Sequence, residues 1–107
     1  MSESGQYLYV IRPERTAMLL EGPSSEEEEI LKGHISYLKE LTEQGVVILA
    51  GRTQTADEKT FGIVVFHADS EESAHRIMQE DPVVKQGVMR AELFPFKAAY
   101  QGKAFPE

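Results

Sequence analysis

Cysteine is absent from the 107 residues, and so is tryptophan. The lack of cysteine excludes disulfides, thiolate metal ligands and cysteine nucleophiles together. It also fits a reducing compartment, so we expect the cytoplasm. Basic residues are few, with 11 Lys and Arg against 18 Asp and Glu, and the formal net charge is −7. Nucleic acids and anionic membranes are bound mainly through positive charge, so we expect neither as a partner.

Long apolar runs and several common motifs are missing as well. No stretch approaches the ~20 residues that span a bilayer, and the opening MSESGQ lacks the features of a secretion signal. The sequence contains no glycine-rich phosphate loop and no nucleophile-elbow motif, so nucleotide binding and serine hydrolysis have no support. Apolar residues make up 41% and charged residues 27%, which is typical of one globular domain.

The apolar pattern predicts four strands and two helices in the order β-α-β-β-α-β. The expected strands are 7–12, 46–50, 61–66 and 89–94, and the expected helices are 24–45 and 70–81. We interpret 13–23 as a loop. This order is that of the ferredoxin-like α+β fold, an antiparallel four-stranded sheet with both helices on one face. Pro95 has no amide donor and is expected at a strand end or a sheet edge.

The first helix carries the clearest signals. Ser24 and Glu27 have the spacing of a capping box, and Gly45 supplies a left-handed C-terminal stop. Between them, apolar residues recur at steps of three and four and form a stripe that includes His34. Its apolar members are Ile30, Leu31, Leu38 and Leu41.

Two expected strands are apolar on both faces. A sheet with helices on one side and water on the other should alternate apolar and polar residues, yet 46–49 and 63–66 do not. A second copy packed sheet to sheet would cover the extra face and form a two-fold homodimer. The alternative is a monomer in which the tail and the loop at 51–59 cover that face.

His34 is the first candidate for chemistry. It lies in the apolar stripe, where a helix that needs only stability would carry leucine. A half-buried imidazole with a carboxylate beside it suits a general base. The alternative is a core histidine bonded to a backbone carbonyl.

Asp81 is the second candidate. Pro82 forces it out of helical conformation, so its carboxylate is held on a rigid turn. The alternative is that Asp-Pro serves only as a helix stop. Both helices of the expected fold lie on one sheet face, so His34 and Asp81 are able to meet in the groove between them.

Other polar positions carry weaker signals. Arg52, at the end of the second strand, is suited to bind an anionic substrate, and Gly51 allows close backbone approach there; the alternative is a solvated loop arginine. His67 and His75 lack metal-ligand spacing, so we expect no metal site.

Several short segments together resemble the YCII-related (YciI-like) family. The segments are Tyr7-Leu8-Tyr9-Val10-Ile11, His34-Ile35-Ser36-Tyr37-Leu38 with Leu41 and Gly45, Leu49-Ala50-Gly51, Ser70-Glu71-Glu72-Ser73-Ala74, Asp81-Pro82-Val83 with Gly87-Val88, and Glu92-Leu93-Phe94-Pro95-Phe96. The resemblance implies one domain over 1–107, with a core at about 7–97 and a polar tail at 98–107. It also implies the dimeric α+β barrel form of the fold.

The family is similar to muconolactone isomerases and includes a dehydrochlorinase that acts on chlorinated aromatic compounds. Its proposed His-Asp active site corresponds to His34 and Asp81. The chain departs from the family at Arg52 and Val83, where proline and phenylalanine are frequent. Both changes are expected near the pocket, so the resemblance does not imply a substrate.

These observations favour an enzyme that transfers a proton on a small organic molecule, with Arg52 suited to an anionic one, without a cofactor. Isomerisation, dehydration and elimination of HX belong to this class. The alternative is a non-catalytic dimer that binds a small ligand or serves as an accessory subunit. A haem-binding oxygenase would need His34 as an iron ligand, and the acidic chain shows no cluster suited to haem propionates.

Overall fold

The structure, a computed structural model, describes residues 5–102. Its elements are β1 (Gly5–Pro13), α1 (Ala17–Glu21), α2 (Ser25–Glu43), β2 (Val47–Arg52), β3 (Gly62–Ala68), α3 (Glu71–Glu80), α4 (Pro82–Lys85) and β4 (Met89–Phe96). The strands form one sheet in the order β2-β3-β1-β4, and all neighbours are antiparallel. The predicted ferredoxin-like α+β arrangement is confirmed.

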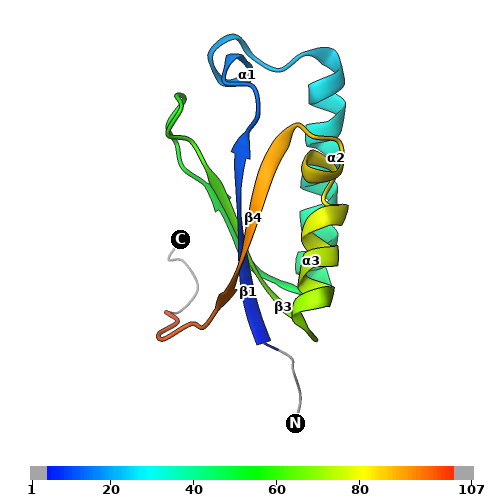
Figure 1. Cartoon of the computed structure of the whole chain (residues 1–107), viewed down its shortest axis with the longest axis vertical. Helices are drawn as coiled ribbons and strands as arrows, with labels where there is room; N and C mark the ends of the chain where they lie inside the picture. Colours follow the sequence, from blue (N-terminus) through cyan, green and yellow to red (C-terminus); the bar gives the residue numbers. More distant parts are fainter. Residues whose placement is uncertain (1–4, 103–107) are drawn as a thin grey trace.

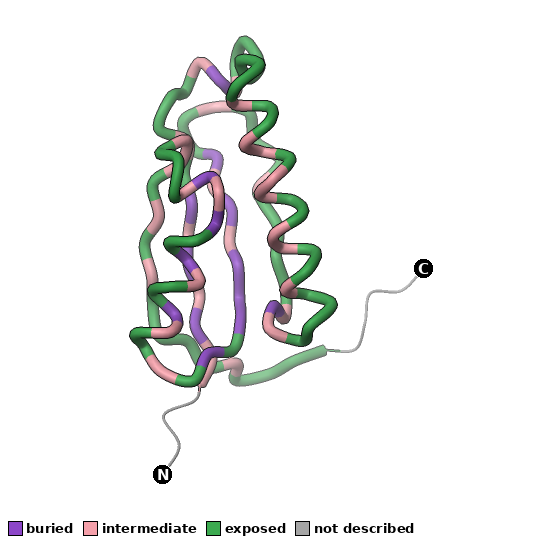
Figure 2. Tube along the Cα trace, turned by 90° about the vertical axis from the view of Figure 1, so that its right-hand side faces the viewer, coloured by how far each residue is buried: buried purple, intermediate pink, exposed green. Residues whose placement is uncertain are grey.

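Helices α2 and α3 lie side by side on one face of the sheet (Figures 1 and 2). The core lies between these helices and the two central strands. Alternate residues of β1 and β3 point into it, as expected for strands with one covered face. The buried strand residues in this core are Tyr7, Tyr9, Ile11, Val47, Val64, Phe66 and Ala68, and the helices contribute Ala74, Met78 and Val83.

The predicted helix boundaries rest on the expected caps. Ser24 accepts a hydrogen bond from the Glu27 amide, and the Glu27 carboxylate accepts one from the Ser24 amide. Gly45 has a φ of 80°, which suits glycine at a helix end. Ser70 caps α3 by accepting from the Ser73 amide. Local signals therefore set the start of both long helices.

Two short helices were not predicted. The expectation of a loop over 13–23 is wrong, because α1 occupies part of it. Thr16 gives that helix no side-chain cap, and Met18 is its buried residue, so tertiary packing and not a local signal holds it. Helix α4 begins directly after α3 with Pro82 in its first turn, since a proline that ends one helix also suits the start of the next.

Strand ends also differ from the prediction. The last strand continues to Phe96, and Pro95 lies in β4, which is an edge strand as proline requires. The second strand begins at Val47 and carries an irregularity between Val47 and Leu49. The unbroken apolar run of that strand is therefore not a regular alternation across the sheet.

The sheet face opposite the helices carries an apolar row. The strand register aligns Leu49, Val65, Leu8 and Phe94 across all four strands. Leu49 is 46% exposed, and Phe94 and Phe96 are each 40% exposed. The loop at 51–59 and the tail at 98–102 thus leave the edge strands of this face exposed, while Val65 near its centre is 7% exposed; the rest of the expected tail, 103–107, lies outside the described residues. We call this surface the open face.

No helix within residues 5–102 is long and apolar enough to cross a membrane.

Candidate active site

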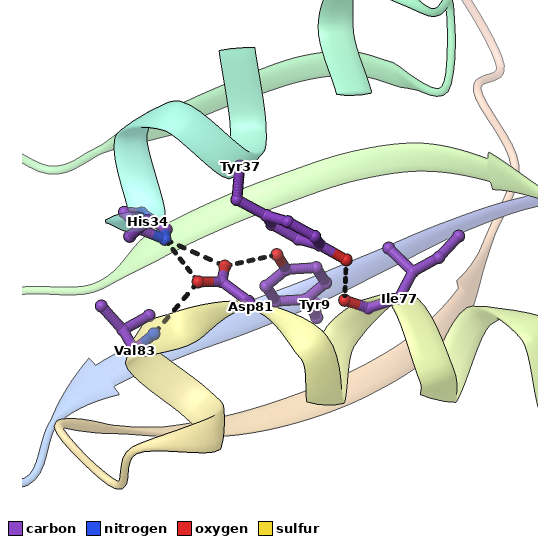
Figure 3. Close-up of polar contacts among 6 residues, drawn as sticks. All are labelled: Tyr9, His34, Tyr37, Ile77, Asp81 and Val83. Carbon is purple, nitrogen blue, oxygen red and sulfur yellow. Dashed lines mark hydrogen bonds and ion pairs between the residues drawn. The ribbon is translucent and has the colours of Figure 1, made fainter. Parts of the chain in front are cut away.

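His34 and Asp81 lie against each other beneath the helices (Figure 3). The Nδ1 atom of His34 is 2.7 Å from Oδ1 and 2.9 Å from Oδ2 of Asp81. The His34 side chain is 14% exposed, whereas that of Asp81 is completely buried. The structure therefore brings together two residues that are 47 positions apart in the sequence.

Asp81 is fixed by its place between two helices. It ends α3 and caps α4, with a φ of −62° and a ψ of 124°, the extended conformation imposed by the following proline. Its carboxylate accepts a hydrogen bond from the Val83 amide at 3.2 Å. The acid therefore serves both as a helix stop and as the partner of His34.

Helix α4 approaches α2 closely beside His34. A Cβ atom added to Gly33 would lie 3.4 Å from Cγ of Pro82. The turn that carries Asp81 therefore packs directly against the helix that carries His34. An added Cβ would be in ordinary van der Waals contact with Pro82, so the two helices are packed at contact distance here.

Tyr9 is a third member of the site. Its hydroxyl donates to Oδ2 of Asp81 at 2.7 Å, and the residue is fully buried in the centre of the sheet. Burial, followed by the charge of Asp81 and the hydrogen bond to it, raises the pKa of Tyr9 far above its usual value. Tyr9 therefore stays protonated and remains a donor over the physiological pH range.

These contacts favour one tautomer of His34. An ionised carboxylate only accepts hydrogen bonds, so Tyr9, the Val83 amide and Nδ1 of His34 all act as donors toward Asp81. A neutral imidazole with hydrogen on Nδ1 keeps a free lone pair on Nε2. In this tautomer Nε2 is the ring nitrogen able to accept a proton.

Tyr37 fastens α2 to α3 next to this site. Its hydroxyl donates to the carbonyl oxygen of Ile77 at 2.6 Å (Figure 3). That carbonyl needs a partner because the Asp81 amide bonds instead to Met78. Burial, and then the charges of Glu80 and Asp81, raise the pKa of Tyr37 to about 12.

The sequence reading did not single out Tyr9 or Tyr37 as site residues. A usable signal existed for Tyr9, since it alternates with Tyr7 and Ile11 on the inward face of a central strand. A tyrosine buried at such a position requires an acceptor for its hydroxyl. For Tyr37 the carbonyl it binds becomes free only through the geometry at the end of α3.

Gly51 and Arg52 lie elsewhere in the chain. They line a hollow of about 290 Å³ beside the β2–β3 hairpin, together with Leu49, Thr53, Phe61 and Ile63. Neither His34 nor Asp81 lines this hollow. Within one chain the structure thus groups the four predicted site residues into two separate places.

Candidate metal ligands do not gather in the described part of the chain. Across residues 5–102, no group of three His, Asp or Glu side chains is arranged to hold a metal ion. His67 and His75 are both exposed, one on β3 and the other on α3.

Comparison with known proteins identifies a family that matches most of the chain. Residues 6–97 match the YCII-related domain family. No curated protein sequence matches the chain.

Two solved structures show the same fold. One is 5-chloro-2-hydroxyhydroquinone dehydrochlorinase (TftG) from Burkholderia phenoliruptrix AC1100, in complex with 2,5-dihydroxybenzoquinone. It is 18% identical, has a TM-score of 0.61 and covers 85% of this chain and 93% of its own. The other is the uncharacterized protein TM1266 from Thermotoga maritima, with 14% identity, a TM-score of 0.56 and coverage of 89% and 100%. At such low identity the likeness concerns the fold, and the family follows from the match over 6–97: the chain belongs to the YCII-related domain family.

Proposed function

We propose that this protein is an enzyme that transfers a proton on a small organic molecule without a cofactor, with Nε2 of His34 as the base. The observation that carries the proposal is the contact between Nδ1 of His34 and the buried carboxylate of Asp81. A histidine that served only to fill the core would need one backbone carbonyl as its partner. A fully buried carboxylate is an expensive partner, and such groups are concentrated at functional sites.

The proposed reaction begins when Nε2 removes a proton from an activated C–H bond of the substrate. His34 then becomes an imidazolium, and the adjacent carboxylate of Asp81 stabilises its positive charge. The electron pair of the broken bond moves into the substrate. It either expels a leaving group such as halide or hydroxide, or returns to another carbon that receives the proton from Nε2. These outcomes are elimination of HX, dehydration and isomerisation.

The comparisons support this reaction class. The dehydrochlorinase of the same fold is named for loss of HCl, and an elimination of that kind needs a base for the proton. Its bound 2,5-dihydroxybenzoquinone is a small, oxygenated ring. We therefore propose small oxygenated or halogenated ring compounds as the first substrates to test.

Arg52 and Gly51 remain our proposal for holding an anionic group of the substrate. Arg52 is exposed, and the hollow that it lines is mostly apolar apart from Arg52 and Thr53. Because the His34–Asp81 pair lies outside that hollow, this role requires the assembled protein to join the two places in one pocket.

We also propose that a second copy of the chain covers the open face. The apolar row across the four strands supports this, because exposed Leu49 and Phe94 would lose contact with water in a two-fold dimer. Facing sheets bury such rows against each other at about 10 Å separation. The dimer is thus part of the proposed functional unit.

Proton exchange with solvent tests the proposed function without knowledge of the complete reaction. The protein is incubated in D₂O with a panel of lactones, hydroxyhydroquinones and chlorinated hydroquinones, and NMR follows deuterium entering the substrate. We expect catalysed exchange or product formation with at least one compound. His34→Gln should slow it by ~10² to 10⁴-fold.

The matched control is His75→Gln, which removes an exposed histidine from α3 and should leave the exchange rate unchanged. Equal exchange by His34→Gln and the unaltered protein would contradict the assignment of the base. Binding of panel compounds without any exchange or turnover would favour the non-catalytic ligand-binding alternative.

A further inference from the structure

We infer that Tyr9 is a positioning residue of this site: its hydroxyl holds the Asp81 carboxylate and limits how strongly that carboxylate stabilises protonated His34. The catalytic meaning of this inference rests on the proposed function. The hydrogen-bond arrangement of Tyr9, Asp81 and His34 does not depend on that function, because it exists in the protein without substrate.

The geometry gives each carboxylate oxygen its own anchor. Oδ2 accepts from the Tyr9 hydroxyl at 2.7 Å, and Oδ1 accepts from the Val83 amide at 3.2 Å. Nδ1 of His34 lies between the two oxygens, at 2.7 and 2.9 Å. Without Tyr9 the carboxylate would keep the amide as its one anchor outside His34, and it would be free to turn about that contact.

The hydroxyl of Tyr9 is not required for packing. The ring meets Phe66 edge to face, with centroids 5.7 Å apart and planes at 71°, and phenylalanine would make the same contact. A buried hydroxyl costs free energy unless it is hydrogen-bonded. The position thus carries a polar atom that the core does not need, aimed at the carboxylate that contacts His34.

Charge is the second effect of the Tyr9 hydroxyl. A donor on Oδ2 draws negative charge away from the side of the carboxylate that faces His34. His34 is then stabilised less strongly in its protonated form and more readily regains the free base. Tyr9 keeps its own proton at the same pH, so it stays a donor to Oδ2 and the carboxylate remains the acceptor for a proton on Nδ1.

Few other titratable groups face the pair. Tyr37 comes from the same helix as His34, and Glu80 directly precedes Asp81 on α3. Lys85 is exposed on α4, and the residues of β3 beneath the site, Val64 and Phe66, are apolar. Tyr9 is a buried side chain that donates a hydrogen bond to Asp81. A change at Tyr9 therefore alters the hydrogen bonding of that carboxylate and leaves the other titratable groups in place.

The test measures how His34 reacts with diethyl pyrocarbonate, which modifies neutral imidazole, as a function of pH. Mass spectrometry of the peptide that contains His34 gives the rate, and exposed His67 and His75 serve as internal references. In Tyr9→Phe the midpoint of the His34 curve should move to higher pH by roughly half a unit or more, since a hydrogen bond to a charged group is lost.

The matched control is Tyr7→Phe. Tyr7 lies two residues earlier on the same face of β1 and also packs against Phe66, with centroids 6.1 Å apart. In Tyr7→Phe the midpoint of the His34 curve should equal that of the unaltered protein. No shift in Tyr9→Phe, or an equal shift in both variants, would overturn the inference.

A second variant covers the case in which Tyr9→Phe does not fold. Replacement of Tyr9 by 3-fluorotyrosine keeps the ring and the hydroxyl but makes the hydroxyl a stronger donor. The midpoint should then move to lower pH, opposite to Tyr9→Phe, whereas an upward or absent shift would overturn the inference. Because this measurement uses no substrate, its outcome is independent of whether His34 proves to be the catalytic base.

Discussion

The two faces of the sheet are built on opposite principles. The face beneath the helices is closed by the chain itself and encloses a polar group, Asp81, which accepts hydrogen bonds from Tyr9 and the Val83 amide and lies against Nδ1 of His34. The open face leaves Leu49 and Phe94 exposed. Burial of the carboxylate on one face costs free energy of folding, whereas the other face leaves apolar side chains exposed to water.

This difference separates what one chain completes from what it leaves to a partner. The His34–Asp81 pair is formed inside a single chain, from α2 and the junction of α3 with α4. The hollow beside Gly51 and Arg52 opens on the hairpin, away from that pair. We therefore expect changes at the covered face to alter folding and chemistry, and changes at the open face to alter assembly.

The largest expected effect comes from Asp81→Ala. This change leaves the Tyr9 hydroxyl, the Val83 amide and His34 Nδ1 without their acceptor in a fully buried place. The free energy of unfolding should fall by about 3 to 5 kcal/mol, measured by denaturant titration. Glu80→Ala, one residue earlier and exposed, should change it by less than about 0.5 kcal/mol. Equal losses in the two variants would show that the buried cluster contributes nothing specific.

The next effect concerns the open face. Phe94→Glu places a charge at the β4 end of the apolar row, so a sheet-to-sheet dimer should dissociate while the covered face stays folded. Light scattering should show twice the chain mass of 12.0 kDa for the unaltered protein and the single mass for the variant.

Glu92→Gln is the control for Phe94→Glu, since it lies on the same strand and the same face and is already polar. It should leave the dimer intact. An unaltered protein that stays at 12.0 kDa at high concentration would contradict the role we give to the open face.

The smallest effect appears at alkaline pH. The pKa of Tyr9 is raised in the folded chain, so its stabilising contribution is complete below about pH 10, the ordinary tyrosine value, and declines as pH rises further. Tyr9→Phe lacks this titration and should lose stability less steeply above pH 10, by up to about 1.4 kcal/mol per pH unit. Thermal unfolding between pH 9 and 11 measures the two slopes, and parallel curves would count against the buried hydroxyl as a constrained donor.

The covered face was largely predictable from the sequence because its signals are local. The aromatic and β-branched run of β1, the capping box at Ser24 and the Asp81-Pro82 stop are signals of this kind. They also place His34 and Asp81 on helices of the same sheet face, where the two are able to meet, but the contact itself has no local signal. Extension of a single domain over 1–107 and a cytoplasmic location stay predictions.

The remaining features depend on tertiary contacts. Helix α1 has no side-chain cap, so no local sequence signal predicts it. Helix α4 begins at Pro82, and a proline at that position is equally typical of the end of the preceding helix. The link between Tyr9 and Asp81 joins residues 72 positions apart, and only packing of β1 beneath the helices brings them together. The sequence also does not predict that Arg52 lies apart from the His34–Asp81 pair, because the position of Arg52 depends on the direction of the β2–β3 hairpin in the folded chain.

The position of the proton on His34 tests the central claim most directly. In a ¹⁵N-labelled sample at neutral pH, two-dimensional NMR that correlates ring nitrogens with ring protons distinguishes the protonated nitrogen from the free one. We predict that neutral His34 carries its proton on Nδ1, with a free lone pair on Nε2, while exposed His67 and His75 average between forms. A proton found on Nε2 of neutral His34, or averaging like that of the exposed histidines, would contradict the account.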